Sequence, residues 1–70
     1  MNYKQIIDPV VFLQANFVLA FIKRHKISLQ DFLELDKQKD ILGFLRLGYE
    51  PFHLTGEENV MEALDAHVYR

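Results

Sequence analysis

The sequence predicts an all-α fold, a small four-helix orthogonal bundle made of one long N-terminal helix and three shorter ones. No stretch alternates apolar and polar residues with the period of a β-strand, whereas apolar residues recur at helical spacing in four segments. Capping residues, glycine or proline mark the ends of these segments. A chain of 70 residues is expected to form one domain over residues 1–70, with residues 1–7 as a disordered tail.

The first helix is expected to begin at Asp8, as the N-cap, with Pro9 in the first helical position. It should end near Lys26, where a run of basic residues complements the negative end of the helix dipole. Between residues 10 and 22 only Gln14 and Asn16 are polar. This is unusual, because a surface helix normally has one apolar face and one polar face.

The apolar residues of this first helix form two stripes, separated by about 100–120° around the helix axis. One contains Val10, Leu13, Phe17 and Phe21, and the other contains Val11, Ala15, Val18, Leu19 and Ile22, with Phe12 beyond it. One stripe is enough for packing within the chain. Either the short helices cover both stripes, or one stripe is kept for another molecule; the sequence leaves both open.

The second helix is expected over residues 29–37, with Ser28 and Asp31 forming a capping box. It should present three apolar side chains on one side, namely Leu29, Phe32 and Leu33. The third helix should begin near Asp40 and present Ile41, Phe44 and Leu45. It is expected to stop by Glu50, because Pro51 disfavours helical geometry in the preceding residue, and residues 51–54 should then be an extended connector.

The last helix is expected over residues 56–68, with Thr55 as its N-cap and Glu58 as the reciprocal partner. At 100° per residue, one face of this helix is apolar and the opposite face is acidic. The apolar face consists of Val60, Met61, Leu64 and Val68, and the acidic face of Glu58, Glu62 and Asp65. The acidic face is expected to be solvated or to meet a basic surface of a partner.

Composition limits the class of protein. The hydrophobic content of 50% is too high for a disordered chain, and the absence of Cys excludes disulfide bonds and thiolate metal sites. The apolar run of the first helix is shorter than the roughly 20 residues of a membrane span, and no signal peptide is recognised. We therefore expect a cytoplasmic protein without a membrane partner.

Charge is distributed unevenly along the chain. Four basic residues against one acidic residue give +3 over residues 1–26, three against four give −1 over residues 27–48, and one against five give −4 over residues 49–70. The overall charge is −2. A negative chain with few clustered cations offers little to neutralise phosphates, so nucleic-acid binding is not expected.

Catalytic equipment is scarce. Ser28 is the only Ser and Thr55 the only Thr, and both are better explained as helix caps than as nucleophiles. No glycine-rich phosphate loop and no i, i+4 pair of His residues is present. We therefore expect no catalytic residues, no cofactor and no metal; a metal-dependent enzyme built on His53 and Glu58 is the least favoured alternative.

Three large side chains stand where a connector normally has small polar residues: Tyr49, Phe52 and His53. They either close the end of the bundle or form a recognition surface, because aromatic side chains often anchor interfaces. The candidate partner-binding set is drawn from the first helix, this segment and the acidic face. It consists of Phe12, Phe17, Leu19, Tyr49, Phe52, His53, Glu58, Glu62 and Asp65.

Four stretches together resemble a family of short bacterial proteins catalogued as a domain of unknown function: ISLQDFLEL, ILGFL, YEPFH and EENVMEALD. The resemblance covers roughly residues 17–68. The matching positions are Ser28, Asp31, Ile41, Tyr49, Glu50, His53, Glu58, Asn59, Leu64 and Asp65. The chain departs from the family at Leu35 and Asp36, where a Trp-Asp pair is common, and at Pro51, which is unusual there.

This family has no assigned activity, and its members are often encoded beside toxin-like proteins, including ones that resemble ADP-ribosyltransferases. The resemblance therefore implies a small interaction protein, the antitoxin-like half of such a pair. We accordingly predict a non-enzymatic protein–protein interaction module that acts by surface occlusion. The alternatives are a homodimeric structural protein, whose interface would complete the small core, and a small helix-turn-helix DNA-binding regulator using the second and third helices.

Overall fold

The computed structural model describes residues 8–70, and this part of the chain is α-helical without β-strands. The helices are α1 (Pro9–His25), α2 (Leu29–Lys39), α3 (Ile41–Leu47), α4 (Tyr49–Phe52) and α5 (Glu57–Tyr69). The all-α prediction is confirmed. The described residues form five helices rather than the predicted four, and the additional one is the short α4. The predicted disordered tail, residues 1–7, lies outside the described residues.

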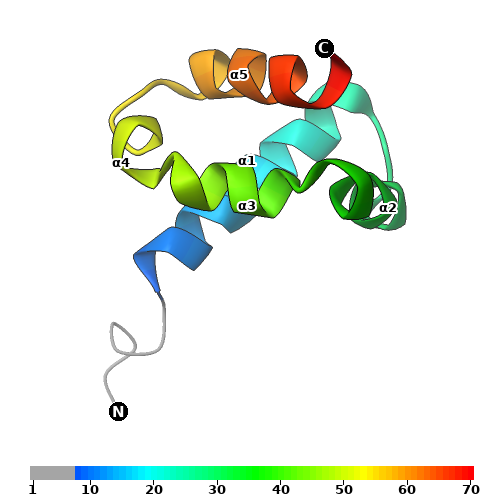
Figure 1. The fold of residues 1–70 in the computed structure, drawn as a ribbon, viewed down its shortest axis with the longest axis horizontal. Helices are drawn as coiled ribbons and strands as arrows, with labels where there is room; N and C mark the ends of the chain where they lie inside the picture. Colours follow the sequence, from blue (N-terminus) through cyan, green and yellow to red (C-terminus); the bar gives the residue numbers. More distant parts are fainter. Residues whose placement is uncertain (1–7) are drawn as a thin grey trace.

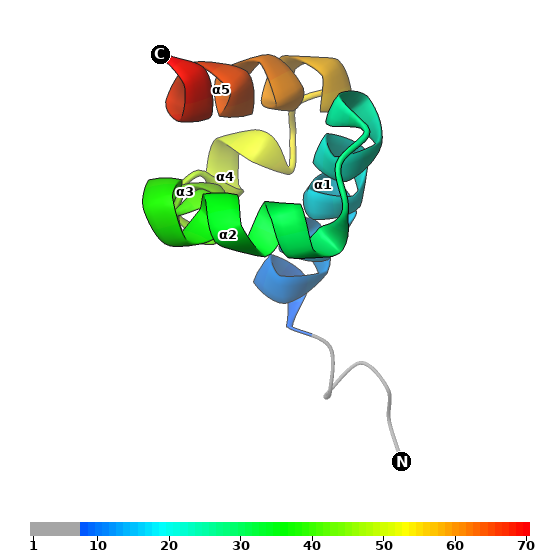
Figure 2. The same cartoon turned by 90° about the vertical axis from the view of Figure 1, so that its right-hand side faces the viewer.

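The helix α1 packs against both α3 and α5. Figure 1 shows α1 passing behind α3, with α5 above and the short α4 at one side. The helix α2 is viewed end-on there, and the quarter turn in Figure 2 shows it lengthwise. The short helices therefore lie on one side of α1, and its opposite side faces outward.

The predicted caps of α1 and α2 are confirmed. The Asp8 carboxylate accepts a hydrogen bond from the backbone N–H of Val10 (2.8 Å), next to Pro9 at the helix start. At the start of α2 the Ser28 hydroxyl accepts from the Asp31 N–H (3.0 Å), while the Asp31 carboxylate accepts from the Ser28 N–H (3.3 Å). Two backbone N–H groups that have no partner within the helix are thus hydrogen-bonded, as a capping box requires.

The apolar face predicted for α2 is mostly not buried. Only Phe32 enters the core, whereas Leu29 and Leu33 are exposed. The main neighbour of α2 is α3, and only the side that carries Phe32 is covered, where its ring packs edge-on against Phe21 (centroids 6.1 Å apart). At the following junction Asp40 adopts a left-handed conformation (φ 50°), and its carboxylate caps α3 by accepting from the Gly43 N–H.

Two predictions around Pro51 are wrong. The extended connector predicted over residues 51–54 is not present, since Pro51 and Phe52 belong to α4. Pro51 stands in the first turn of this helix, where its missing N–H is not needed. Thr55 is not the cap of α5: Gly56 occupies that position, and the Thr55 hydroxyl donates instead to the Pro51 carbonyl (2.6 Å). Thr55 therefore closes the end of α4.

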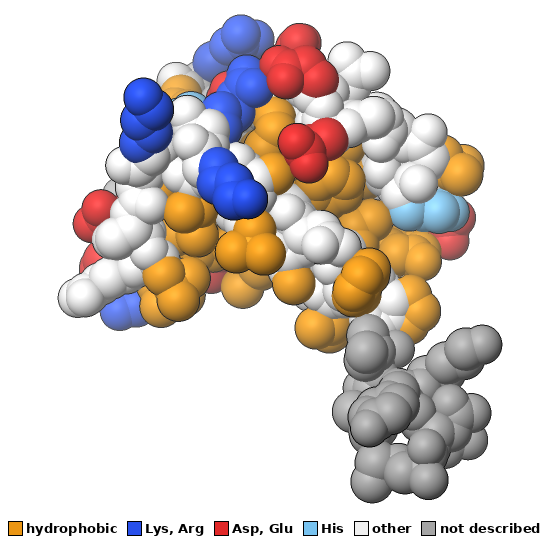
Figure 3. Space-filling view, turned by 180° about the vertical axis from the view of Figure 1, so that it is seen from behind, with side chains coloured by type: hydrophobic (Ala, Val, Ile, Leu, Met, Phe, Trp, Pro, Cys, Tyr) orange, Lys and Arg blue, Asp and Glu red, His pale blue; other side chains and the backbone are white. Residues whose placement is uncertain are grey.

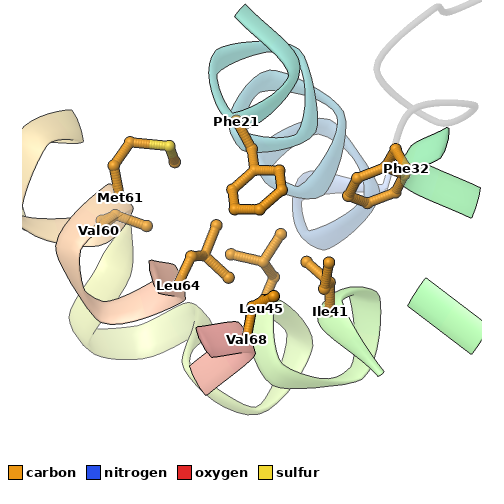
Figure 4. Close-up of a cluster of buried hydrophobic side chains, with 8 residues drawn as sticks. All are labelled: Phe21, Phe32, Ile41, Leu45, Val60, Met61, Leu64 and Val68. Carbon is orange, nitrogen blue, oxygen red and sulfur yellow. The ribbon is translucent and has the colours of Figure 1, made fainter. Parts of the chain in front are cut away.

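The core is one apolar cluster between α1, α2, α3 and α5, drawn in Figure 4. Its fully or almost fully buried members are Phe21, Phe32, Ile41, Leu45, Val60, Met61, Leu64 and Val68. The four residues predicted for the apolar face of α5 are all among them. No residue of α4 is fully buried, so this helix lies at the edge of the core.

Candidate functional site

A hollow of about 300 Å³ lies between the N-terminal half of α1 and the segment around α4. Its lining brings together five of the nine candidate residues: Phe12 and Phe17 from α1, and Tyr49, Phe52 and His53 from α4 and its end. Leu13, Asn16, Thr55 and Pro9 complete the wall. Aromatic rings with a few polar groups and no charged side chain form this surface, which we call the aromatic hollow.

The helix α4 is held by ring packing more than by burial. Tyr49 and His53 stack one turn apart, with ring centroids 4.8 Å apart and planes at 14°, and His53 Nδ1 lies 2.8 Å from the Tyr49 carbonyl oxygen. Phe52 packs on Phe44 of α3 with a centroid distance of 5.6 Å. The rings are thereby fixed in orientation, which reduces the entropy that a bound partner would have to remove.

Gly48 is the residue that lets Phe52 approach the α3–α4 corner. A Cβ atom at this position would collide with the Phe52 ring. The backbone of Gly48 has φ −90°, which any residue can adopt, so close packing rather than conformational freedom requires glycine here.

A second hollow, of about 630 Å³, lies further along α1 where it faces the start of α5. Leu19 and Glu58, two more of the candidate residues, line it, and Asn16 lies on the wall of both hollows. This second hollow carries charged residues of both signs, including Lys23, Arg24 and Glu57. The two depressions therefore follow the same side of α1, with an apolar half and a charged half.

The predicted acidic face is largely occupied within the chain. The Arg24 guanidinium pairs with Glu58 (3.0 Å) and Asp65 (3.0 Å), and His25 Nε2 lies 2.7 Å from Asp65. Among the ion pairs of residues 8–70, Glu62 takes part in none. The three carboxylates thus do not form one open acidic stripe.

The surroundings of Asp65 act on its pKa in opposite directions. Burial of the carboxyl would raise its pKa, but the hydrogen bonds from His25 and Arg24 outweigh this effect and hold the pKa below the usual 3.8. The hydrogen bonds to Glu58 and Asp65 raise the pKa of Arg24. Asp65 is therefore a structural anion that joins α5 to the end of α1.

The outward side of α1 is mainly apolar between Val11 and Leu19. Val11, Phe12 and Leu19 are each more than half exposed, and Ala15 is exposed as well. Figure 3 views the molecule from behind and shows hydrophobic side chains across this surface, with basic and acidic side chains gathered toward the top. The two stripes of the first helix are thus treated differently: one enters the core, and part of the other faces outward.

Sequence reasoning missed several features near these surfaces. Leu47 and Leu54, which flank α4 in the chain, are 89% and 81% exposed, yet neither was singled out because an isolated leucine carries no periodic signal. His25 was also not singled out, yet it is half-buried between Phe21 (ring centroids 4.5 Å apart) and Tyr69 (5.3 Å). Its i, i+4 relation to Phe21 was readable; its distant partner Asp65 was not.

Within residues 8–70, no group of three or more His, Asp or Glu side chains is placed to hold a metal ion. None of the helices described is both long and apolar enough to cross a membrane. Comparisons with protein-family models, curated proteins and solved structures found no match to this chain.

Proposed function

We propose that this chain is a non-enzymatic protein–protein interaction module that binds a protein partner at the aromatic hollow and acts by covering a surface of that partner. The observation that carries the proposal is the convergence of five aromatic or His side chains from α1 and α4 on one depression. Rigid aromatic side chains beside a depression are the usual anchors of binding energy in interfaces.

The chemistry of the hollow indicates what would enter it. An apolar side chain of the partner fits the rings of Phe12, Phe17 and Phe52, while the polar groups of Asn16, His53 and Thr55 can bond its backbone. No charged side chain lines the hollow, and Glu58 and Asp65 are paired with Arg24 elsewhere in the chain. The hollow therefore favours an apolar, uncharged anchor from the partner.

The arrangement of the helices supports the same proposal. We infer that they form an orthogonal bundle in which short helices cross α1 on one side only. Crossing helices touch one another over a short length, so they cover one stripe of α1 and leave the other for a second molecule. The resemblance to small bacterial proteins encoded beside toxin-like proteins supports an antitoxin-like role in the cytoplasm.

The test uses the product of the gene adjacent to this one as the partner. Its toxicity is measured by growth of a bacterial host, with and without this chain, and complex formation is measured with the purified proteins by light scattering. We expect growth to be restored and a stable complex to form. A toxic neighbour that this chain neither binds nor neutralises would contradict the antitoxin-like role.

A matched pair of variants locates the binding site. His53→Glu places a negative charge on the rim of the hollow, and Leu47→Glu places the same charge on a fully solvated side chain at the end of α3. We expect His53→Glu to weaken the complex at least tenfold and Leu47→Glu to leave it unchanged. Equal effects of the two variants would show that the hollow is not the site.

A further inference from the structure

We infer that the outward face of α1 is a self-association surface, on which a second copy of this chain packs its own α1 in antiparallel orientation. This goes beyond the proposed function, because it concerns a different occupant. The outward face shares Phe12 and Asn16 with the aromatic hollow but extends to Ala15 and Leu19, which do not line it. The occupant follows from the residues of this face and their charges.

Phe12 and Leu19 lie at the centre of the outward face of α1. Phe21, at the middle of the buried side, lies about 180° from Phe12 and about 160° from Leu19 at 100° per residue. The centre of the outward face is therefore occupied by Phe12 and Leu19, which are 58% and 56% exposed. A monomer would be expected to place charged residues at this position, as other surface helices do.

The positions of these residues fit a two-fold symmetric antiparallel pair of α1 helices. An antiparallel pair related by a two-fold axis between Ala15 and Asn16 places Phe12 of each copy against Leu19 of the other. Near the axis the small Ala15 side chain allows the two helix backbones to approach closely. On the other flank of the contact the Asn16 amides of the two copies face each other, and such a polar pair fixes the register of two packed helices.

The charged residues at the two ends of α1 favour the antiparallel orientation over the parallel one. The same pairing brings Asp8, at the N-terminal end of one α1, beside Lys23 in the last turn of the other. The opposed helix dipoles also attract each other. In a parallel pair the basic last turns, which contain Lys23 and Arg24, would meet instead, and like charges would repel. The charges of α1 therefore favour one orientation of the second copy.

Self-association would also stabilise the folded chain. A chain of 70 residues without Cys has a small core and no disulfide bonds to support it. Packing two copies removes Phe12 and Leu19 of both from water at once, and so adds apolar burial that the single chain lacks.

The first test is the solution mass across a dilution series. We expect about twice the 8.3 kDa of one chain for the wild type. Leu19→Glu should halve this mass, whereas the control Leu47→Glu should not change it. A monomeric wild type at every concentration, or equal masses for the two variants, would overturn the inference and assign the α1 face to another occupant.

The second test determines the orientation and uses the absence of native Cys. Under mild oxidation, Ala15→Cys should form a cross-linked dimer on its own, because this position lies beside the two-fold axis. Phe12→Cys and Leu19→Cys should each cross-link poorly alone but efficiently when mixed. Leu47→Cys is the control for random collision. Efficient cross-linking of each single variant by itself would indicate a parallel pair and overturn the antiparallel arrangement.

The two proposals fail separately. A monomeric wild type that still binds its partner through the side of His53 would remove the self-association surface and keep the hollow. A dimer in which His53→Glu has no effect on the partner would do the reverse.

Discussion

The two ends of α1 are built differently. At the C-terminal end, Phe21 is completely buried, Arg24 and His25 bond to Asp65, and the ring of His25 packs between Phe21 and Tyr69. At the N-terminal end, α1 faces the four-residue α4, which contributes no fully buried side chain, and a hollow remains between them. One end is closed by packing and charge, and the other is left open.

This difference shows where a small chain keeps its stability and where it can keep a binding surface. Both ends contain aromatic residues, so the amount of apolar surface does not distinguish them. The distinction is whether a long helix covers the rings of α1: α5 does so for Phe21, while α4 is too short to do so for Phe17.

Phe21→Ala should remove most of the stability of the chain. Truncating a buried Phe costs about 3–5 kcal/mol, and a domain of this length has an unfolding free energy of only roughly 4–10 kcal/mol. Chemical denaturation followed by circular dichroism measures the loss. The control is Leu47→Ala, which alters an exposed side chain and should change stability by less than about 0.5 kcal/mol. If the two variants were equally stable, the closed end would not be the source of stability.

Gly48→Ala should disturb the open end and leave the closed end intact. The new methyl group meets the Phe52 ring, which has to turn away from its contact with Phe44, at a cost of about 1–3 kcal/mol. NMR should show altered aromatic resonances for Phe52 and unchanged ones for Phe21. Leu47→Ala is the control, because that side chain is exposed, and its effect should stay within about 0.5 kcal/mol. Unchanged Phe52 resonances would mean that the ring does not define the hollow.

Asp65→Asn should weaken the closed end moderately. The amide keeps the shape of the carboxyl group but loses the charge that His25 and Arg24 bond. The expected loss is about 1 kcal/mol in the free energy of unfolding. Glu62→Gln is the matched control on the same helix, since Glu62 forms no ion pair with the described residues. An equal effect for both would show that Asp65 acts only through overall charge.

The same carboxyl should make stability depend on pH in acid. The pKa of Asp65 is lowered in the folded chain, so its contribution is fully present above about pH 3.8, the usual value in an unfolded chain, and is lost as the pH falls through the lower folded pKa. In the wild type, the denaturation midpoint should decrease as the pH is lowered below this value. The slope should be smaller for Asp65→Asn. An identical slope in both proteins would contradict the assignment.

The closed end was largely readable from the sequence. The periodic apolar residues of α5 and the side of α1 that contains Leu13 and Phe21 identified core positions, since a 3.6-residue period reports directly on burial. The caps at Asp8 and Ser28 were readable because each depends on residues within three positions. What escaped prediction was the bonding of Arg24 and His25 to Asp65, which lies 41 and 40 residues away, respectively, because this bonding depends on how two helices pack.

The open end was readable in composition but not in structure. Tyr49, Phe52 and His53 stood out as large residues in a presumed connector, and the structure places all three at one hollow. Pro51 misled the local prediction, because a proline excludes a helix interior but is accepted in a first turn. The position of Thr55 was also wrong, since Thr serves equally as a cap of the next helix or as a donor to the preceding one.

Thr55→Val should have the smallest effect and should sharpen the comparison most finely. The variant keeps the shape of the side chain but removes the hydroxyl that donates to the Pro51 carbonyl, so the end of α4 loses one exposed hydrogen bond worth about 0.5 kcal/mol. We expect hydrogen exchange at the His53 N–H, which bonds the Tyr49 carbonyl, to quicken while exchange in α5 stays unchanged. The substitution Ser28→Ala is the comparison at the other end, where the lost cap should cost about 1 kcal/mol. If Thr55→Val quickened exchange in both α4 and α5, the two ends of α1 would be one cooperative unit, and the openness of the hollow would not reflect an independently weak α4.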